Sequence, residues 1–66
     1  MRYEFLIAGC VSDTVRAAFE GFDVQEGPAG GTVIYGPIRD KAALLGVVAR
    51  FDNLGLTLIE MRQLPD

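Results

Sequence analysis

Apolar and polar residues alternate in several short runs of the chain, and this alternation predicts strands. Residues 3–8 (YEFLIA) have the period of two that is typical of a β-strand, with aromatic and branched side chains on the stronger face. Residues 22–25 (FDVQ), 32–36 (TVIYG) and 56–61 (LTLIEM) predict three more strands. Pro37 ends the third of them, because proline cannot donate a hydrogen bond to a neighbouring strand.

A longer period predicts two helices. The stronger pattern consists of apolar residues at positions i, i+3, i+4, i+7 and i+10, namely Leu44, Val47, Val48, Phe51 and Leu54. Asp40 is a suitable N-cap for this helix, and Gly55 suits the position just after its end. A weaker pattern predicts a helix over residues 13–20, with Ser12 as its N-cap and Gly21 at its end.

The order strand, helix, strand, strand, helix, strand predicts a ferredoxin-like α+β sandwich. In this fold a four-stranded antiparallel sheet carries both helices on one face. Right-handed crossovers give the strand order 4-1-3-2, which places the two most apolar strands, 3–8 and 32–36, in the middle. Residues 27–31 (GPAGG) are expected to form a hairpin loop. We expect residues 1–66 to form a single domain, because so short a chain leaves no room for a second.

Residues 31–61 contain the pattern T-x-x-x-G-P-x-x-D-x-A-x-L-x-G-x-x-x-R-x-x-x-L-G-L-x-L. This half of the chain resembles a large set of small bacterial proteins that read nearly GPVxDQAALHGLLxRIxDLGLxLLxV. The resemblance implies no established reaction, cofactor or ligand, because that family is uncharacterised. Lys41 stands where Gln is usual and Leu45 where His is frequent, so any chemistry of that His is absent here. Most shared residues have structural explanations: Gly36 and Gly46 would let the third strand and the second helix approach closely.

Composition argues against several functional classes. The formal charge of −3 comes from nine acidic and six scattered basic residues, whereas nucleic-acid binding needs a clustered basic surface. No apolar run reaches the ~18 residues of a membrane-spanning helix, and no signal peptide is recognisable. With one cysteine and no histidine, we expect no disulfide, no metal site and no cofactor. The free thiol agrees with a cytoplasmic location.

The small size of the chain favours self-association. A domain of this length buries only about 60% of the surface that its unfolded chain exposes, so its stability alone is marginal. Small domains usually gain further stability from disulfides, a metal or a second subunit. Since the first two are not expected here, a homodimer is the leading prediction.

The sheet is predicted to be apolar on both faces at its centre. If the stronger faces of the strands contact the helices, the opposite face carries Leu6, Ala8, Val33, Tyr35 and Leu58. An antiparallel sheet with one wet face should alternate apolar with polar residues, and an exposed apolar patch usually marks an interface or a ligand surface. The sequence therefore predicts a small non-catalytic interaction or ligand-binding module that self-associates through this face.

Other functional classes remain open. The first alternative is a cofactor-independent enzyme that holds a hydrophobic substrate in a cavity at a dimer interface, with Tyr35, Cys10 and Glu4 as its candidate groups. A second alternative is a ligand-sensing domain of the ACT type, which would use glycine-rich loops near Gly9 or Gly36. The chain could also be accessory to a protein partner encoded nearby.

Two single residues are weaker candidates for a site. Cys10 lies just before a predicted helix, and a helix N-terminus lowers the pKa of a thiol; the simpler interpretation is a half-buried small residue. Arg39 could help to bind an anion at the start of the second helix, but Asp40 is expected to occupy that helix end. A cross-strand cluster of ion pairs is also predicted at one end of the sheet, formed by Arg2, Glu4, Glu60 and Arg62.

Overall fold

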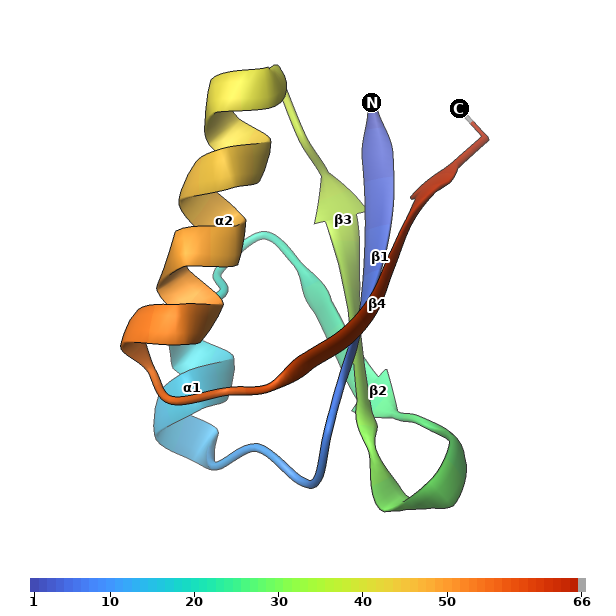
Figure 1. Ribbon diagram of the computed structural model, residues 1–66, viewed down its shortest axis with the longest axis vertical. Coiled ribbons are helices and arrows are strands. Elements are labelled where there is room, and N and C mark those ends of the chain that lie inside the picture. The colour runs from blue at the N-terminus through green and yellow to red at the C-terminus, as the bar shows by residue number, and fades with distance from the viewer. Residues whose placement is uncertain (66) are drawn as a thin grey trace.

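The strands and helices follow each other in the predicted order. The computed structural model describes residues 1–65, which form one four-stranded antiparallel sheet and two α-helices. The elements are β1 (Arg2–Ile7), α1 (Asp13–Ala17), β2 (Asp23–Glu26), the 3-10 turn η1 (Pro28–Gly30), β3 (Thr32–Pro37), α2 (Lys41–Asn53) and β4 (Leu58–Leu64). Both helices lie on the same side of the sheet (Figure 1). The fold is therefore α+β with two layers.

The sheet has the order β2-β3-β1-β4, so the two most apolar strands are central. Read from the β4 edge, the same sheet runs 4-1-3-2. All three strand pairs are antiparallel. The short strand β2 and the strand β4 form the two edges, and β4 passes in front of β1 in Figure 1.

The core lies between the sheet and the two helices. Its buried apolar side chains are Phe5, Ile7, Phe19, Ile34, Ile38, Val47 and Phe51. The ring centroid of Phe51 lies 5.0 Å from that of Phe5 and 5.1 Å from that of Phe19. Aromatic pairs at such distances add to the stability gained from burial alone. Phe51 therefore joins α2 both to the central strand and to the segment that follows α1.

The predicted helix caps are confirmed. The Ser12 hydroxyl accepts a hydrogen bond from the backbone N–H of Val15 at 3.2 Å. The Asp40 carboxylate accepts one from the N–H of Ala43 at 2.8 Å. Gly55 follows the C-cap of α2 with a φ of 72°, the left-handed conformation that favours glycine.

The last strand begins and ends later than predicted. Leu56 donates its backbone N–H to the carbonyl of Phe51 at 2.9 Å, and Gly55 donates to Asp52 at 3.0 Å. These two bonds form the Schellman closure of α2, so Leu56 belongs to the helix end rather than to the strand. At the other end, β4 continues to Leu64 instead of stopping at residue 61. The first helix is shorter than predicted and ends at Ala17.

Gly36 and Gly46 have different surroundings. A Cβ atom on Gly36 would lie only 2.7 Å from the ring of Phe22, so this glycine allows a close approach by Phe22. A Cβ atom on Gly46 would meet nothing within 4 Å. The expectation that Gly46 lets α2 pack closely against β3 is therefore wrong.

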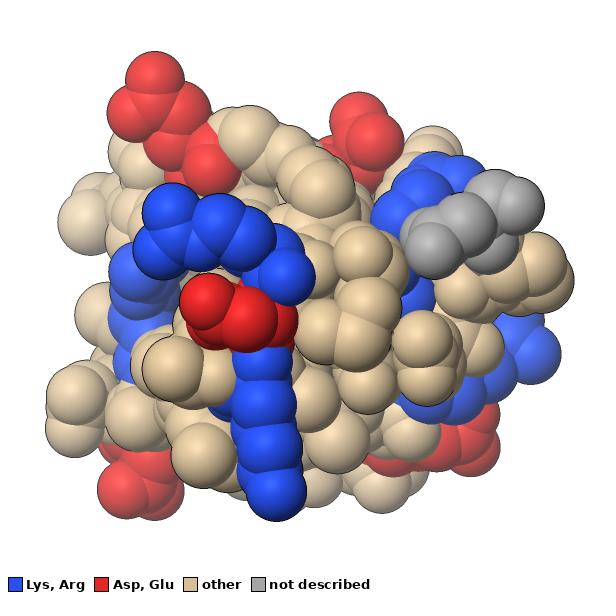
Figure 2. Space-filling view, turned by 90° about the horizontal axis from the view of Figure 1, so that it is seen from above, with Lys and Arg blue, Asp and Glu red and all other residues tan. Residues whose placement is uncertain are grey.

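Charged side chains of both signs are dispersed over the face shown in Figure 2. Figure 2 looks onto the end of the molecule where α2 begins, and acidic and basic side chains alternate there with uncharged residues. This face has no extended field of one sign, which agrees with the scattering of basic residues along the sequence.

Candidate functional site

The outer face of the sheet, meaning the face turned away from both helices, has a small apolar centre. The strand register places Leu6 between Val33 and Glu60, and Val33 between Leu6 and Gln25. Leu6 and Val33 thus form an adjacent pair across two strands, and the next residue across the sheet is polar on both sides of this pair. Leu6 and Val33 are both half-buried. The apolar centre is therefore narrower than the sequence predicts.

The neighbouring row of the outer face is polar. Tyr35 lies between Asp23 and Glu4, and Glu4 lies beside Arg62. The Tyr35 hydroxyl accepts a hydrogen bond from the Gln25 side chain at 3.0 Å. Glu4 and Arg62 form an ion pair at 3.3 Å, which is the part of the predicted cross-strand cluster that the structure contains. This row is therefore polar, as expected for the solvent-facing side of an antiparallel sheet.

The prediction that Leu58 belongs to the outer face is wrong. Leu58 pairs with Ile7, whose side chain is fully buried under the helices, and it packs against the core. The cause is a shift of register between β1 and β4 after Leu6, which leaves Ile59 as an extra residue in β4. Such a bulge changes which side chains face the core. Ile59 is 59% exposed as a result of this local geometry.

The loop between β2 and β3 covers part of the outer face. A Cβ atom on Gly27 would lie 3.0 Å from the Val33 side chain and 3.3 Å from that of Leu6, so the loop contacts both. In Figure 1 this loop curls to the side of the sheet away from the helices. Of the residues predicted for this face, Ala8 is exposed, while Tyr35 is half-buried. The loop therefore covers part of the apolar centre.

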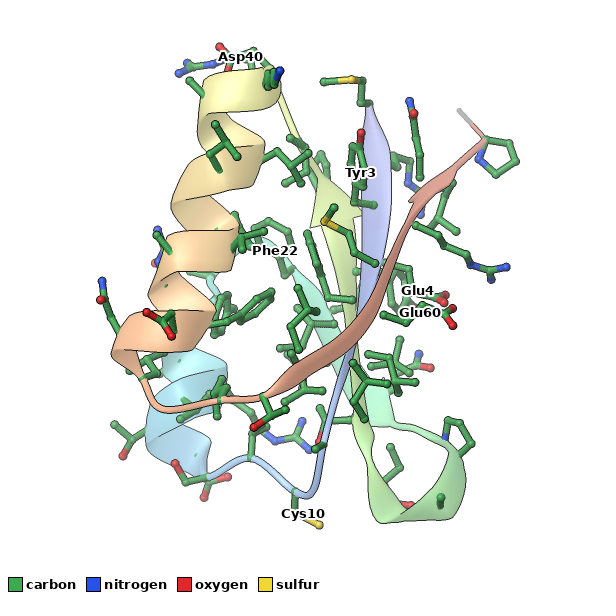
Figure 3. The ribbon with its side chains drawn as sticks, viewed as in Figure 1. Tyr3, Glu4, Cys10, Phe22, Asp40 and Glu60 are labelled. Atoms are coloured by element: carbon green, nitrogen blue, oxygen red, sulfur yellow. The ribbon has the colours of Figure 1, made fainter. Side chains whose placement is uncertain are left out.

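Cys10 lies at the bottom of the molecule as drawn in Figure 3, and it is exposed rather than half-buried. It borders a depression of about 210 Å³ together with Val11, Arg16, Glu26, Gly27, Gly30, Gly31 and Thr32. Its Sγ atom lies 3.9 Å from the carbonyl oxygen of Gly30. Within residues 1–65, no group of three His, Cys, Asp or Glu side chains is placed to hold a metal ion.

Arg39 is exposed at the opposite end of the molecule. Its guanidinium lies 3.7 Å from the Asp40 carboxylate, which caps α2 as predicted. Figure 3 shows Asp40 at the top of α2 and Cys10 near the far end of β1. The structure therefore does not bring the two weaker candidates, Cys10 and Arg39, together.

A second depression, of about 430 Å³, runs along one flank of α2. It is lined by Glu20, Phe22, Pro37, Ile38, Arg39, Ala43, Gly46, Val47 and Arg50. Arg50 is held by the protein itself: it donates to the carbonyl of Ala18 at 3.0 Å and lies 5.5 Å from the centroid of the Phe19 ring. Gly46 forms an open part of this wall, because no side chain fills the space beside it.

The side of α2 that points away from the sheet carries a short apolar stripe, which is flanked by the exposed polar residues Lys41, Arg50, Asp52 and Asn53. We call it the outer face of α2, and it consists of four exposed residues at helical spacing: Ala42, Leu45, Gly46 and Ala49. Leu45 is 58% exposed. Sequence reasoning missed this surface because it followed only the stronger stripe that begins at Leu44. The signal was present as a second apolar stripe at i, i+3, i+4 and i+7.

Taken together, these features describe a small two-layer α+β domain with exposed apolar surface and no assembled set of reactive groups among its described residues. The chain belongs to a family known as a domain of unknown function (DUF8691), whose model matches residues 2–62. No curated protein and no solved structure matches the chain. None of the helices within residues 1–65 has the length and apolar character needed to cross a bilayer.

Proposed function

We propose that this protein is a small non-catalytic interaction module that acts as a homodimer. The observation that carries the proposal is the composition of α2. Its charged residues are Lys41, Arg50 and Asp52, and apolar residues or glycine occupy most of its remaining circumference. Half of its eight exposed residues are apolar or glycine, and these four form one stripe, the outer face of α2. An exposed apolar surface usually marks an interaction site.

The size of the chain favours a second copy as that partner. The core consists of only seven buried apolar side chains, and the described residues include one free cysteine and no metal cluster. Domains of this size commonly gain stability by association. A homodimer would add buried apolar area without any further component.

We also propose a fold family, a set of relatives and a cellular location for this protein. The element order and the placement of both helices on one face support assignment to the ferredoxin-like folds. We further propose that its relatives are the small bacterial proteins whose C-terminal half it resembles, and that it acts in the cytoplasm. An additional protein partner encoded nearby would be compatible with this role.

The alternative of a cofactor-independent enzyme has no observation in its favour. It would need a cavity at the dimer interface with Tyr35 in its wall. Within one copy, neither of the two depressions described above is lined by Tyr35, and the Tyr35 hydroxyl accepts a hydrogen bond from Gln25. We therefore put forward no catalytic function.

Sedimentation equilibrium of the full chain tests the proposal. Across the micromolar range we expect the average mass to rise from the 7.1 kDa of one chain toward that of two. The midpoint of this rise gives the dissociation constant. A single species with the mass of one chain at every concentration would overturn the proposal of a homodimer.

A further inference from the structure

We propose that two copies associate through the outer face of α2, with the two helices antiparallel and the two-fold axis near Gly46. This inference rests on the proposed function, namely that the chain is a self-associating module. It adds the surface, the orientation and the residues that decide the affinity.

The first support is the division of α2 into two apolar faces. At 3.6 residues per turn, Leu44, Val47 and Phe51 lie on the side that packs against the sheet. The residues of the outer face of α2 lie on the other side, and all of them are exposed. Leu45 would supply the large apolar side chain of the contact, and the alanines and glycine around it would let the two helix backbones come close.

The second support is Gly46. Glycine in the middle of a helix is less stable than alanine, so it needs a compensating reason. Among residues 1–65 there is none, because a Cβ atom at this position would meet no atom within 4 Å. In an antiparallel pair, Gly46 would lie at the point where the two helices cross. There the absence of a side chain would permit the closest approach.

The third support is the placement of charge at the ends of α2. Lys41 is the first residue of the helix and Asp52 lies in its last turn, so both have the wrong sign for the helix dipole. The ion pairs recorded among residues 1–65 include neither of them. In an antiparallel pair, Lys41 would lie beside Asp52 of the second copy and near the negative end of its helix. The same arrangement would recur at the other end by symmetry.

The outer face of the sheet is a poorer surface for this contact. Its apolar side chains Leu6 and Val33 are half-buried and contacted by the loop at Gly27. The interface of a single helix pair is smaller than the ~800 Å² per partner of a standard stable complex. We therefore expect a weak dimer, with a dissociation constant in the micromolar range.

Two variants, each with one substitution, test whether the dimer forms through the outer face of α2 or through the outer face of the sheet. Leu45→Glu places a charge in the centre of the proposed contact, and because Leu45 is exposed the monomer should fold normally. Tyr35→Lys is the control on the outer face of the sheet, where a lysine would lie between Asp23 and Glu4. By sedimentation equilibrium we expect Leu45→Glu to weaken dimerisation at least about tenfold and Tyr35→Lys to leave it unchanged. Circular dichroism verifies that both variants are folded.

The outcomes distinguish this inference from the proposed function. If Leu45→Glu dimerises like the unmodified chain while Tyr35→Lys does not, the chain is still a self-associating module but the surface assigned here is wrong. If the unmodified chain is monomeric, both proposals fail. Gly46→Ala gives an independent signature, since it should raise the thermal stability of the monomer and weaken the dimer. A dimer that is strengthened by this substitution would also overturn the inference.

Cross-linking tests the orientation of the two helices. In a Cys10→Ser background, one preparation carries Ala42→Cys and another carries Ala49→Cys. The two are mixed and treated with a short thiol-specific cross-linker. An antiparallel pair should give mainly the mixed product that joins positions 42 and 49. Products that join each position to itself would indicate a parallel pair and contradict the proposed geometry.

Discussion

At the scale of single residues, the backbone carries an unfavourable conformation at Ala29. This residue has φ 55° and ψ 32°, in the left-handed region. A residue with a Cβ atom costs about 1–2 kcal/mol in that conformation. The turn is closed by hydrogen bonds from Gly27 to Gly31 at 2.8 Å and from Gly31 to Pro28 at 3.0 Å. These bonds hold Ala29 in the loop that covers the outer face of the sheet.

Ala29→Gly should therefore stabilise the protein. We expect the free energy of unfolding in urea to rise by about 1 kcal/mol, less the larger chain entropy of glycine in the unfolded state. Ala17→Gly is the matched control at the end of α1, where the backbone is helical; it should lower the free energy of unfolding by about 0.5–1 kcal/mol. Equal destabilisation by both substitutions would contradict the assigned strain.

Gly36 and Gly46 have contrasting surroundings, so replacing each by alanine should change the free energy of unfolding in opposite directions. Gly36→Ala would bring a Cβ atom to 2.7 Å from Phe22 and should lower the free energy of unfolding by about 1–3 kcal/mol. Gly46→Ala meets nothing within 4 Å and should raise the monomer's stability by up to about 1 kcal/mol. Urea denaturation at low protein concentration measures both. If both substitutions changed the free energy of unfolding in the same direction, the surroundings given for one of the two glycines would be wrong.

At the scale of elements, what the sequence predicts well is local. Caps depend on residues a few positions apart, so Ser12, Asp40 and Gly55 could be recognised from residue type. The register of β4 depends on its pairing with β1, far away in the chain. The bulge at Ile59 and the helix closure at Leu56 therefore cannot be predicted from the sequence, and alternation alone places Leu58 on the wrong face.

The cap of α2 gives a prediction at this scale. Asp40→Ala removes the acceptor for the N–H of Ala43 and should lower the free energy of unfolding by about 1 kcal/mol. Asp40→Asn keeps a side-chain oxygen at the cap and should cost much less, because asparagine is about as good an N-cap as aspartate. Thermal unfolding followed by circular dichroism compares them. Similar losses in both variants would argue that the negative charge, rather than the hydrogen bond, stabilises the helix start.

The molecule as a whole combines a small core with an exposed apolar stripe on α2. The candidate surface on the sheet could be drawn from alternation alone, but its shielding by the loop at Gly27 could not, because that contact joins distant parts of the chain. The outer face of α2 could have been found in the sequence. The sequence alone does not show that this stripe is exposed, because its exposure depends on which side of the helix the sheet covers.

Dimerisation should make the stability depend on concentration. If folding and association are linked, dilution lowers the melting temperature of the unmodified chain by mass action. Leu45→Glu should melt at the same temperature at all concentrations, close to that of the unmodified chain at high dilution. Differential scanning calorimetry over the micromolar range measures this. A melting temperature of the unmodified chain that does not change with concentration would speak against a dimer.

An isotope-filtered NMR experiment tests directly whether two copies associate through the outer face of α2. Labelled and unlabelled chains are mixed at a concentration where association is complete, and only contacts between copies are recorded. An antiparallel pair centred near Gly46 predicts signals from the methyl groups of Leu45 to those of Leu45 and Ala49 of the other copy. Contacts between copies that instead involve Leu6, Val33 or Tyr35 would contradict it.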